Sequence, residues 1–371
     1  MAHRGGSNPR SSVMRLRWTL ALVPGLFVVL PARGADPLPP EQAKKALLKQ
    51  LDRPKVAADE KADGEPVEKG GLVYRRWSFA SEKKADGTVE RVPALTVAPA
   101  GKAEKALPVV IVLHGTGGSK EGMQPWLEAF AKQGVVGVAI DARYHGGRAG
   151  GKNGSEAYVA AITKAWQTPA GQPMEHPFYY DTVWDVWRLL DRLEDPKADK
   201  PRPIGMLGTS MGGVQTWLAA SVDDRVTVAA PLIGVQSFRW SLDNDKWQGR
   251  ANTIKAAHEA AAKDLGEPAV NQKVCRALWA KVVPGILDDF DCPNLLPLFA
   301  ANKRPLFIAN GDTDPNCPIE GARIAIKAAE DAYAKAGAKD RLVVRVNKGV
   351  AHKVTDEDRQ EAVAFCVKWL K

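Results

Sequence analysis

The sequence predicts an α/β protein whose central sheet is mostly parallel and is covered by helices on both faces. Two continuous apolar runs, at 107–113 and 135–140, are typical of strands buried on both sides. Beyond residue 181, helical patterns alternate with further short apolar runs. Such alternation indicates right-handed crossovers onto a parallel sheet.

The expected elements follow in a simple order. Two strands at 72–80 and 89–98, separated by the turn residues 84–87, predict an antiparallel hairpin at the start of the domain. Buried strands are then expected at 107–113, 135–140, from 203 onward, 226–230, 305–310 and 342–346. Helices are expected at 121–133, 181–193, after residue 210, and at 319–336 and 357–370.

One stretch combines a strand, a very tight turn and a helix. The apolar run from Pro203 ends in Gly208-Thr209-Ser210-Met211-Gly212 and passes directly into a sequence compatible with a helix. This is the layout of a nucleophile elbow, which exposes a serine hydroxyl above the sheet. The pentapeptide alone could be an accident, but its strand and helix context favours a catalytic Ser210.

A serine hydroxyl is a weak nucleophile at neutral pH, so it needs a base, and the base needs an acid that orients it. After an elbow, the acid and then the histidine are expected on loops that follow later strands. Asp312 and Asp314 follow the strand at 305–310, and His352 follows the strand at 342–346. Both positions are therefore filled in the required order.

Over residues 71–371 the chain resembles the α/β-hydrolases of the dienelactone-hydrolase-like and acetyl-xylan-esterase-like branch. The resemblance rests on the elbow, on His114-Gly115-Thr116-Gly117-Gly118, and on the acid and histidine loops. It implies an α/β-hydrolase fold and a serine hydrolase that needs no metal and no organic cofactor. Dienelactone hydrolases proper have a cysteine at the elbow, so Ser210 favours an ordinary carboxylic-ester hydrolase.

The resemblance also separates the two aspartates. Related acid loops place a proline four residues beyond the catalytic acid, and Pro318 stands at that distance from Asp314. Asp312 is expected to cap the turn with its side chain. We therefore assign the acid to Asp314 and the base to His352.

The other histidines are expected to have structural roles or to lie away from the site. In related folds a histidine at the position of His114 supports its loop by hydrogen bonding, and His145 is expected to shape the loop after the strand at 135–140. Of the remaining three, His3 lies in the leader, His176 in a loop and His258 in the insertion.

Two backbone N–H groups are expected to form the oxyanion hole. Met211 begins the helix after Ser210, which places its N–H beside the reacting carbon. Thr116 lies in the glycine-rich loop after the strand at 107–113, where the backbone can approach a substrate closely. Together with the triad, these groups predict acyl transfer through an acyl-enzyme.

The first 34 residues differ in kind from the rest. Arg15 and Arg17 precede an apolar run at 18–30, and no acidic residue occurs before Asp36. This layout predicts a secretory signal peptide at 1–34, with an uncleaved anchor as the alternative. The run is short for a membrane span, so we expect a secreted or periplasmic protein without stable membrane association after cleavage.

Residues 35–70 are rich in Lys, Glu, Ala and Pro, and they contain one short amphipathic stretch at 41–51. This composition predicts a linker with one short, loosely docked helix. The hydrolase domain is therefore expected to cover residues 71–371.

Charge and cysteine content limit the classes of partner and site. The leader carries five arginines, so the formal net charge falls from +9 to +4 without it. A charge of this size does not call for nucleic acid. Four cysteines allow one or two disulfides, with Cys275–Cys292 mildly preferred, but they form no cluster typical of a zinc site.

A long insertion separates the strands at 226–230 and 305–310. It spans roughly 70 residues, more than an ordinary connection, and contains helical patterns at 251–265 and 270–282. We expect it to form a helical cap over Ser210, at about 236–300. Its tryptophans could stack on sugar rings, although packing of the cap is preferred. The expected substrate is a small-molecule or polysaccharide-linked ester.

Two alternative functions remain open. A serine peptidase of the prolyl-oligopeptidase type would use the same triad, although residues 35–100 are too short for its propeller domain. A catalytically inactive hydrolase fold that serves as a binding protein would be marked by the loss of Ser210, Asp314 or His352, and all three are present.

Overall fold

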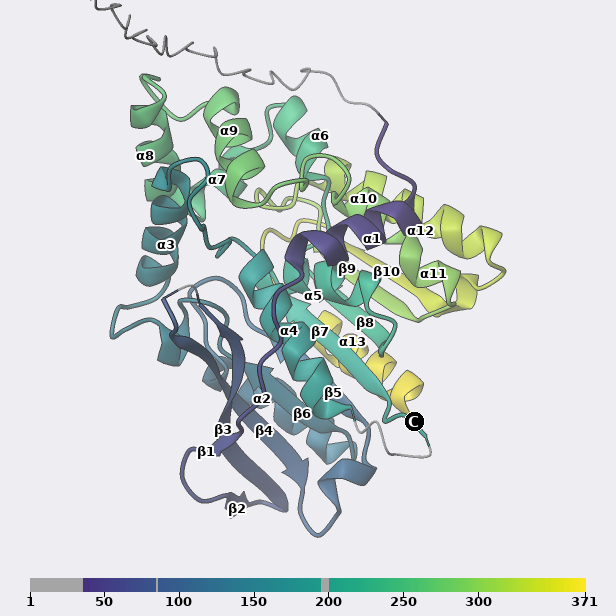
Figure 1. The fold of residues 1–371 in the computed structure, drawn as a ribbon. Helices are drawn as coiled ribbons and strands as arrows, with labels where there is room; N and C mark the ends of the chain where they lie inside the picture. Colours follow the sequence, from purple (N-terminus) through teal and green to yellow (C-terminus); the bar gives the residue numbers. More distant parts are fainter. Residues whose placement is uncertain (1–35, 85, 195–199) are drawn as a thin grey trace, which may run out of the picture. The chain divides into compact units, whose positions relative to one another are not determined.

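The computed structural model describes residues 36–84, 86–194 and 200–371, so the predicted signal peptide at 1–34 lies outside the described residues. In the described part, ten strands form one sheet in the order β1-β3-β4-β6-β5-β7-β8-β9-β10, and β2 pairs with β3 (Figure 1). The strands are β1 Lys61–Ala62, β2 Val67–Lys69, β3 Leu72–Lys83, β4 Val89–Pro99, β5 Val109–Leu113, β6 Val136–Ile140, β7 Ile204–Thr209, β8 Val226–Leu232, β9 Leu306–Gly311 and β10 Leu342–Asn347.

The sheet is parallel from β6 to β10 and antiparallel at its other end. β5 pairs in parallel with both β6 and β7, and β8, β9 and β10 continue in parallel. The hairpin of β3 and β4 joins through an antiparallel pairing of β4 with β6. The predicted opening hairpin and the mostly parallel sheet are confirmed.

Helices cover both faces of this sheet because its central strands are apolar on both sides. In β5, Val109, Ile111 and Leu113 face the core shared with α4 and α5, whereas Val110 and Val112 face the core shared with α2 and α13. The helices are α1 Pro40–Leu51, α2 Gln124–Lys132, α3 Glu156–Gln167, α4 Tyr180–Leu193, α5 Met211–Val222, α6 Phe238–Asp243, α7 Gln248–Asn252, α8 Lys255–Asp264, α9 Gln272–Val282, α10 Cys292–Leu295, α11 Pro297–Ala301, α12 Ile319–Lys335 and α13 Asp356–Leu370. Among the described residues, no helix is both long and apolar enough to span a bilayer.

The segment expected as a linker at 35–70 is part of the folded domain from residue 36 onward. Ala43, Leu47 and Leu51 are buried on one face of α1, which packs against α4, α5, α10 and α11. β1 and β2 then extend the sheet by pairing with β3. The composition was misleading because three apolar residues spaced by four are enough to dock a helix that is otherwise polar.

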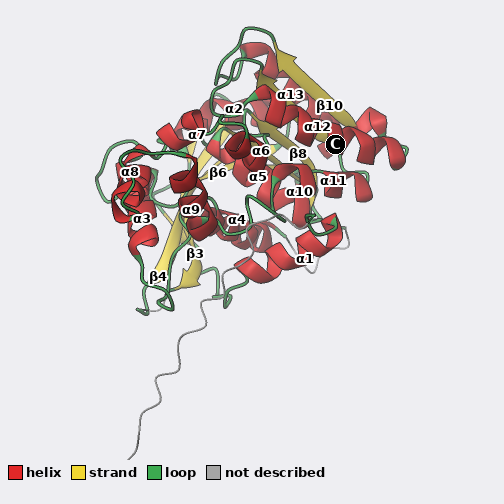
Figure 2. Ribbon diagram, turned by 90° about the horizontal axis from the view of Figure 1, so that it is seen from above, coloured by secondary structure: helices red, strands yellow, loops and turns green. Residues whose placement is uncertain are grey.

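The insertion after β8 divides into two groups of helices. α8 and α9 pack against α3, and α6 packs against α9. α10 and α11 instead pack against α5 and α12, beside the sheet. In Figure 2, α3, α8 and α9 lie together at one side, and α10 and α11 lie at another. The segment predicted at 236–300 is therefore helical, but within it α8 and α9 pack against α3, whereas α10 and α11 do not.

The cysteines form no disulfide. Cys275, Cys292, Cys317 and Cys366, all within the described residues, are free and buried. The preferred pairing of Cys275 with Cys292 was therefore wrong. Cys275 is buried in α9, whereas Cys292 is the first residue of α10, which belongs to the other group of helices. Burial raises the pKa of the Cys275 and Cys366 thiols to about 12. These side chains therefore pack as small apolar groups.

Docking of α1 predicts unequal effects for two adjacent leucines. Leu47 is 0% exposed and Leu48 is 36% exposed. Leu47→Ala should lower the free energy of unfolding by about 2–5 kcal/mol, because it opens a cavity in the core. Leu48→Ala, which costs the same in helix propensity, should change it by less than about 1 kcal/mol. Urea denaturation followed by circular dichroism measures both, and equal losses would contradict a docked α1.

Candidate active site

The elbow places Ser210 between the last residue of β7 and the first residue of α5, at φ 55° and ψ −114°. Glycine is required on both sides of it. A Cβ on Gly208 would lie 2.1 Å from the Gly212 carbonyl oxygen, and one on Gly212 would lie 2.3 Å from the Leu113 carbonyl oxygen. The Ser210 N–H donates to the Leu232 carbonyl at 2.9 Å, which fixes the turn to β8.

Three side chains predicted to act together are brought together at this turn. Ser210 Oγ lies 2.7 Å from His352 Nε2, and His352 Nδ1 lies 2.7 Å from Asp314 Oδ2. The Asp314 carboxylate is fully buried, and its Oδ1 accepts hydrogen bonds from the backbone N–H groups of Asn316 and Cys317. With Nδ1–H donating to the carboxylate, Nε2 is the ring nitrogen that accepts from the serine hydroxyl.

Asp312 has a different place in the same loop. Its Oδ1 accepts from the Gly349 N–H at 2.6 Å, and its own N–H donates to the Asn347 carbonyl at 3.1 Å. Asp312 therefore ties the loop after β9 to the loop after β10, whereas Asp314 contacts the imidazole of His352. The sequence led us to expect that the Asp312 side chain caps its own turn, but its recorded bond joins two loops instead.

The two residues expected to form the oxyanion hole flank Ser210. Met211 is its immediate neighbour and is fully buried. Gly115, just before Thr116, lies so close that a Cβ on it would be 3.4 Å from the Ser210 Cβ. In the described part of the chain, neither the Thr116 nor the Met211 N–H donates to a protein acceptor. Neither N–H is therefore engaged within the described part of the chain, which is a condition for an oxyanion donor.

His114 supports the loop that carries Thr116. Its Nδ1 donates to the Gly115 carbonyl at 2.8 Å, and its Nε2 accepts from the Ala142 N–H at 3.1 Å. Burial lowers the pKa of the His114 imidazole. A neutral ring with one donor and one acceptor fits both bonds, so His114 joins two loops as the sequence led us to expect.

Asp141 joins the same two loops by charge. Its carboxylate accepts from the Lys120 backbone N–H at 2.8 Å, from Lys120 Nζ at 2.9 Å and from the Gly147 N–H at 2.9 Å. The carboxylate is fully buried, so these bonds lie in a medium of low dielectric constant. The loop after β5 is therefore held against the loop after β6.

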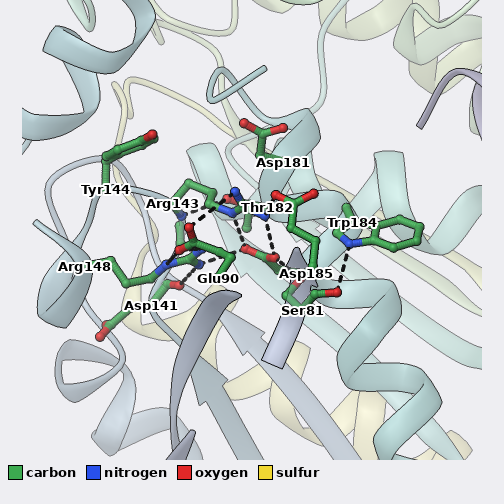
Figure 3. Close-up of polar contacts among 12 residues, drawn as sticks. Ser81, Glu90, Asp141, Arg143, Tyr144, Arg148, Asp181, Thr182, Trp184 and Asp185 are labelled. Carbon is green, nitrogen blue, oxygen red and sulfur yellow. Dashed lines mark hydrogen bonds and ion pairs between the residues drawn. The ribbon is translucent and has the colours of Figure 1, made fainter. Parts of the chain in front are cut away.

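A buried ion cluster joins the loop after β6 to α4 (Figure 3). Asp185 accepts from Arg143 Nε and Arg148 Nη1, both at 2.8 Å, and Arg148 also pairs with Glu90 at 2.7 Å. The Ser81 hydroxyl donates to the same Asp185 carboxylate. The sequence analysis missed this cluster. Its signal was an aspartate on the apolar face of the helix predicted at 181–193.

One group of side chains has the composition of a metal site. Asp314, Cys317 and His352 offer ligand atoms within 4.8 Å of one another. Asp314 and His352 are already bonded to each other, and burial raises the pKa of the Cys317 thiol to about 12. The bond of His352 Nδ1 to Asp314 Oδ2 engages two of the three side chains, so this structure gives the group the arrangement of an acid–base pair.

Comparison with known proteins bears on the fold and the family. Residues 110–364 match the model of the Alpha/beta hydrolase family. The chain is 27% identical over 294 residues to YtaP of Bacillus subtilis (strain 168), named as a candidate hydrolase, which covers 76% of this chain and 84% of that protein.

Solved structures share the fold at lower identity. Acetyl xylan esterase 1 from Thermoanaerobacterium sp. JW/SL YS485 is 18% identical with a TM-score of 0.61, covering 91% of this chain and 96% of that one. The acetyl xylan esterase from Paenibacillus sp. R4 is 19% identical with a TM-score of 0.57, covering 89% and 93%.

The ion cluster predicts a pH-dependent loss of stability in Asp185→Asn. Burial opposes the charge on Asp185, but Arg143 and Arg148 more than offset it and hold the pKa of this carboxyl well below its ordinary value. The substitution should cost about 3–5 kcal/mol of unfolding free energy at pH 7, because it leaves buried guanidinium groups underpaired.

The sign of the pH effect follows from the lowered pKa. The stabilisation by Asp185 is fully present above its unfolded pKa of about 4 and is lost as the pH falls below it. The difference between wild type and Asp185→Asn should therefore be smaller at pH 3 than at pH 7 in urea unfolding. Asp331→Asn, in an exposed pair with Lys327, should cost under about 1 kcal/mol at both pH values. A difference that does not change with pH would contradict an ionised Asp185.

Proposed function

The chain belongs to the alpha/beta hydrolase family, and we propose that it hydrolyses carboxylic esters through an acyl-enzyme on Ser210. One observation carries the proposal: two 2.7 Å contacts connect the Ser210 hydroxyl, through His352, to the buried carboxylate of Asp314. The names of YtaP, a candidate hydrolase, and of two acetyl xylan esterases with this fold support hydrolysis of an ester.

In the first half-reaction Ser210 Oγ attacks the ester carbonyl carbon while His352 Nε2 takes the hydroxyl proton. The carboxylate of Asp314 stabilises the imidazolium that forms. The carbonyl oxygen becomes an oxyanion, which the N–H groups of Thr116 and Met211 bind. Each such donor typically lowers the barrier by about 3 kcal/mol.

Collapse of this intermediate breaks the bond to the alcohol. The imidazolium of His352 gives its proton to the departing alkoxide, and the acyl group stays on Ser210. A water molecule then attacks the acyl carbon as His352 takes one of its protons. The second intermediate expels Ser210 Oγ, which recovers a proton, and the carboxylic acid leaves. This sequence needs no metal and no organic cofactor.

The proposed substrates are small-molecule esters and acetyl esters of carbohydrates. Acetylated carbohydrates are included among the proposed substrates because two proteins with this fold are named acetyl xylan esterases. Trp279 cannot stack on a sugar in this structure, since it is 0% exposed and its Nε1 donates to His258 Nε2 at 3.0 Å. For this residue, the packing interpretation of the cap tryptophans is the one that fits.

Export is a separate proposal that rests on sequence alone. The basic residues, apolar run and small residues of 1–34 have the layout of a signal peptide. We therefore propose that the mature protein acts outside the cytoplasm, on a soluble or polysaccharide-linked ester, without a nucleic-acid partner.

Ser210→Ala tests the nucleophile. It should reduce kcat on p-nitrophenyl acetate by about 10³- to 10⁶-fold, because no acyl-enzyme can form. Circular dichroism should show an unchanged fold. Equal rates for the two proteins would reject the esterase proposal. Hydrolysis of aminoacyl anilides without ester turnover would favour the peptidase alternative, and binding without any turnover would favour an inactive binding protein.

Two matched substitutions test which aspartate is the acid. Asp314→Asn should lower kcat by on the order of 10²- to 10⁴-fold, because the amide cannot stabilise the imidazolium of His352. Asp312→Asn keeps an amide oxygen that can accept from the Gly349 N–H, so it should lower kcat by less than about 10-fold. Steady-state kinetics on p-nitrophenyl acetate measures both, and the reverse order would identify Asp312 as the acid.

A further inference from the structure

Arg250, in α7 of the insertion, lies against the loop that holds Asp314. Its side chain is buried, with 2% exposed. Arg250 Nη2 donates to the Asn316 carbonyl at 3.1 Å and to Cys317 Sγ at 3.3 Å. The backbones of α7 and of the loop that holds Asp314 lie very close together, since a Cβ on Gly249 would be 2.0 Å from the Pro315 carbonyl oxygen.

Gln236, in the segment after β8, completes this contact. With its amide oxygen facing Arg250, the oxygen accepts from Nε at 3.2 Å and from Nη2 at 3.1 Å, and the amide nitrogen donates to the Asn316 carbonyl at 2.8 Å. A planar guanidinium presents Nε and Nη2 side by side, whereas the single nitrogen of an ammonium cannot occupy both positions. Arg250 thus connects three segments: α7, the chain after β8 and the acid loop.

The groups that Arg250 contacts are all uncharged. They are the Asn316 carbonyl, the Gln236 amide, the protonated thiol of Cys317 and the face of Phe238, whose centroid is 5.7 Å from the guanidinium carbon. A guanidinium buried among neutral groups loses hydration without the attraction of a paired carboxylate. Burial opposes the charge of Arg250, and the nearby Tyr179, Cys317 and Asp314 raise its pKa; of these three groups, Asp314 is the carboxylate.

The same turn binds both Arg250 and the Asp314 carboxylate. The backbone N–H groups of Asn316 and Cys317 donate to Asp314 Oδ1 at 2.7 and 3.0 Å. Arg250 contacts the carbonyl of the first residue and the sulfur of the second. Displacing the guanidinium would therefore move the N–H groups that orient the carboxylate.

We propose that Arg250 is a positioning residue, which holds the turn from Asp314 to Cys317 in place and sets a fixed positive charge behind the pair of Asp314 and His352. This inference rests on the proposed function, because it gives the insertion a part in the assembly of that catalytic triad. Arg250 acts through Asp314 and does not touch the substrate.

The other titratable groups near Arg250 do not change charge in the range where the imidazole titrates. They are Tyr158 from α3, Tyr179 from the segment before α4 and Cys317 from the acid loop. Burial raises the pKa of Tyr179 and of Cys317 to about 12, and that of Tyr158 well above its ordinary value. On the His352 side, the facing groups are Ser210 and Asp314. None of the three neighbours of Arg250 therefore changes charge near neutral pH.

Arg250→Gln tests both parts of the proposal. Loss of the clamp should lower kcat on p-nitrophenyl acetate about 10- to 100-fold, because the acid loop is no longer held. Loss of a positive charge near the acid loop makes protonation within the site less unfavourable, so the pH profile of hydrolysis should also move. The acid limb of the kcat/KM profile should move to higher pH by about 0.5–1 unit.

Two further variants serve as controls. Arg250→Lys keeps the charge but cannot span the segments, so it should lose kcat while the acid limb stays within about 0.2 unit of wild type. Arg239→Gln, on α6 and in a partly exposed pair with Asp288, should match wild type in both respects. If Arg250→Gln does not fold, Arg250→Lys decides alone, and wild-type kcat in that variant overturns the clamp.

A titration of the His352 imidazole by NMR keeps the inference testable without turnover. The resonance is assigned from its loss in His352→Gln, and its midpoint should be higher in Arg250→Gln than in wild type. Failure of the proposed function would appear as equal ester hydrolysis by wild type and Ser210→Ala, whatever the titration shows. An unchanged midpoint in folded Arg250→Gln would overturn the charge effect.

Discussion

The turn at Ser210 is the constraint on which the rest of the structure depends. A non-glycine residue at φ 55° is strained by roughly 1–3 kcal/mol and persists only where its surroundings leave no alternative. Gly208 and Gly212 remove the side chains that would push β7, β5 and α5 apart. Because the turn fixes the serine hydroxyl at the carboxyl edge of the sheet, every other part of the site must be supplied by loops at that edge.

Those loops are held by buried polar groups, and this arrangement differs between the two sides of Ser210. On one side, His114 and Asp141 connect the loop after β5 to the loop after β6, and the Asp185 cluster supports the second loop from below. On the other side, backbone N–H groups and Asp312 connect the loops after β9 and β10. Among the described residues, the buried ion pairs of Asp141 and Asp185 lie on the first side, and on the second side Arg250 is buried against uncharged groups.

The sequence was informative wherever a local pattern decides the structure. The elbow and the apolar run at 107–113 predicted β5, β7 and α5, because one strand-turn-helix motif and burial on both faces leave few alternatives. Chain order placed Ser210, His352 and the loop of the acid, since the carboxyl ends of parallel strands share one edge, and the family resemblance was needed to choose Asp314 over Asp312. The docking of α1, the free state of the cysteines and the contacts of Asp185 could not be predicted, because each depends on how segments distant in the chain pack together. Asp185, for example, contacts residues 37, 42 and 104 positions away, and no local pattern identifies them.

The unpaired, buried thiols have a consequence for where this chain can be made. A domain held together by disulfides requires an oxidising compartment before it is stable, whereas this one derives its stability from apolar packing and internal ion pairs. Assembly of its folded state is therefore independent of the glutathione balance around it. A cytosol that keeps cysteines reduced would produce the same domain as a periplasm or an extracellular medium.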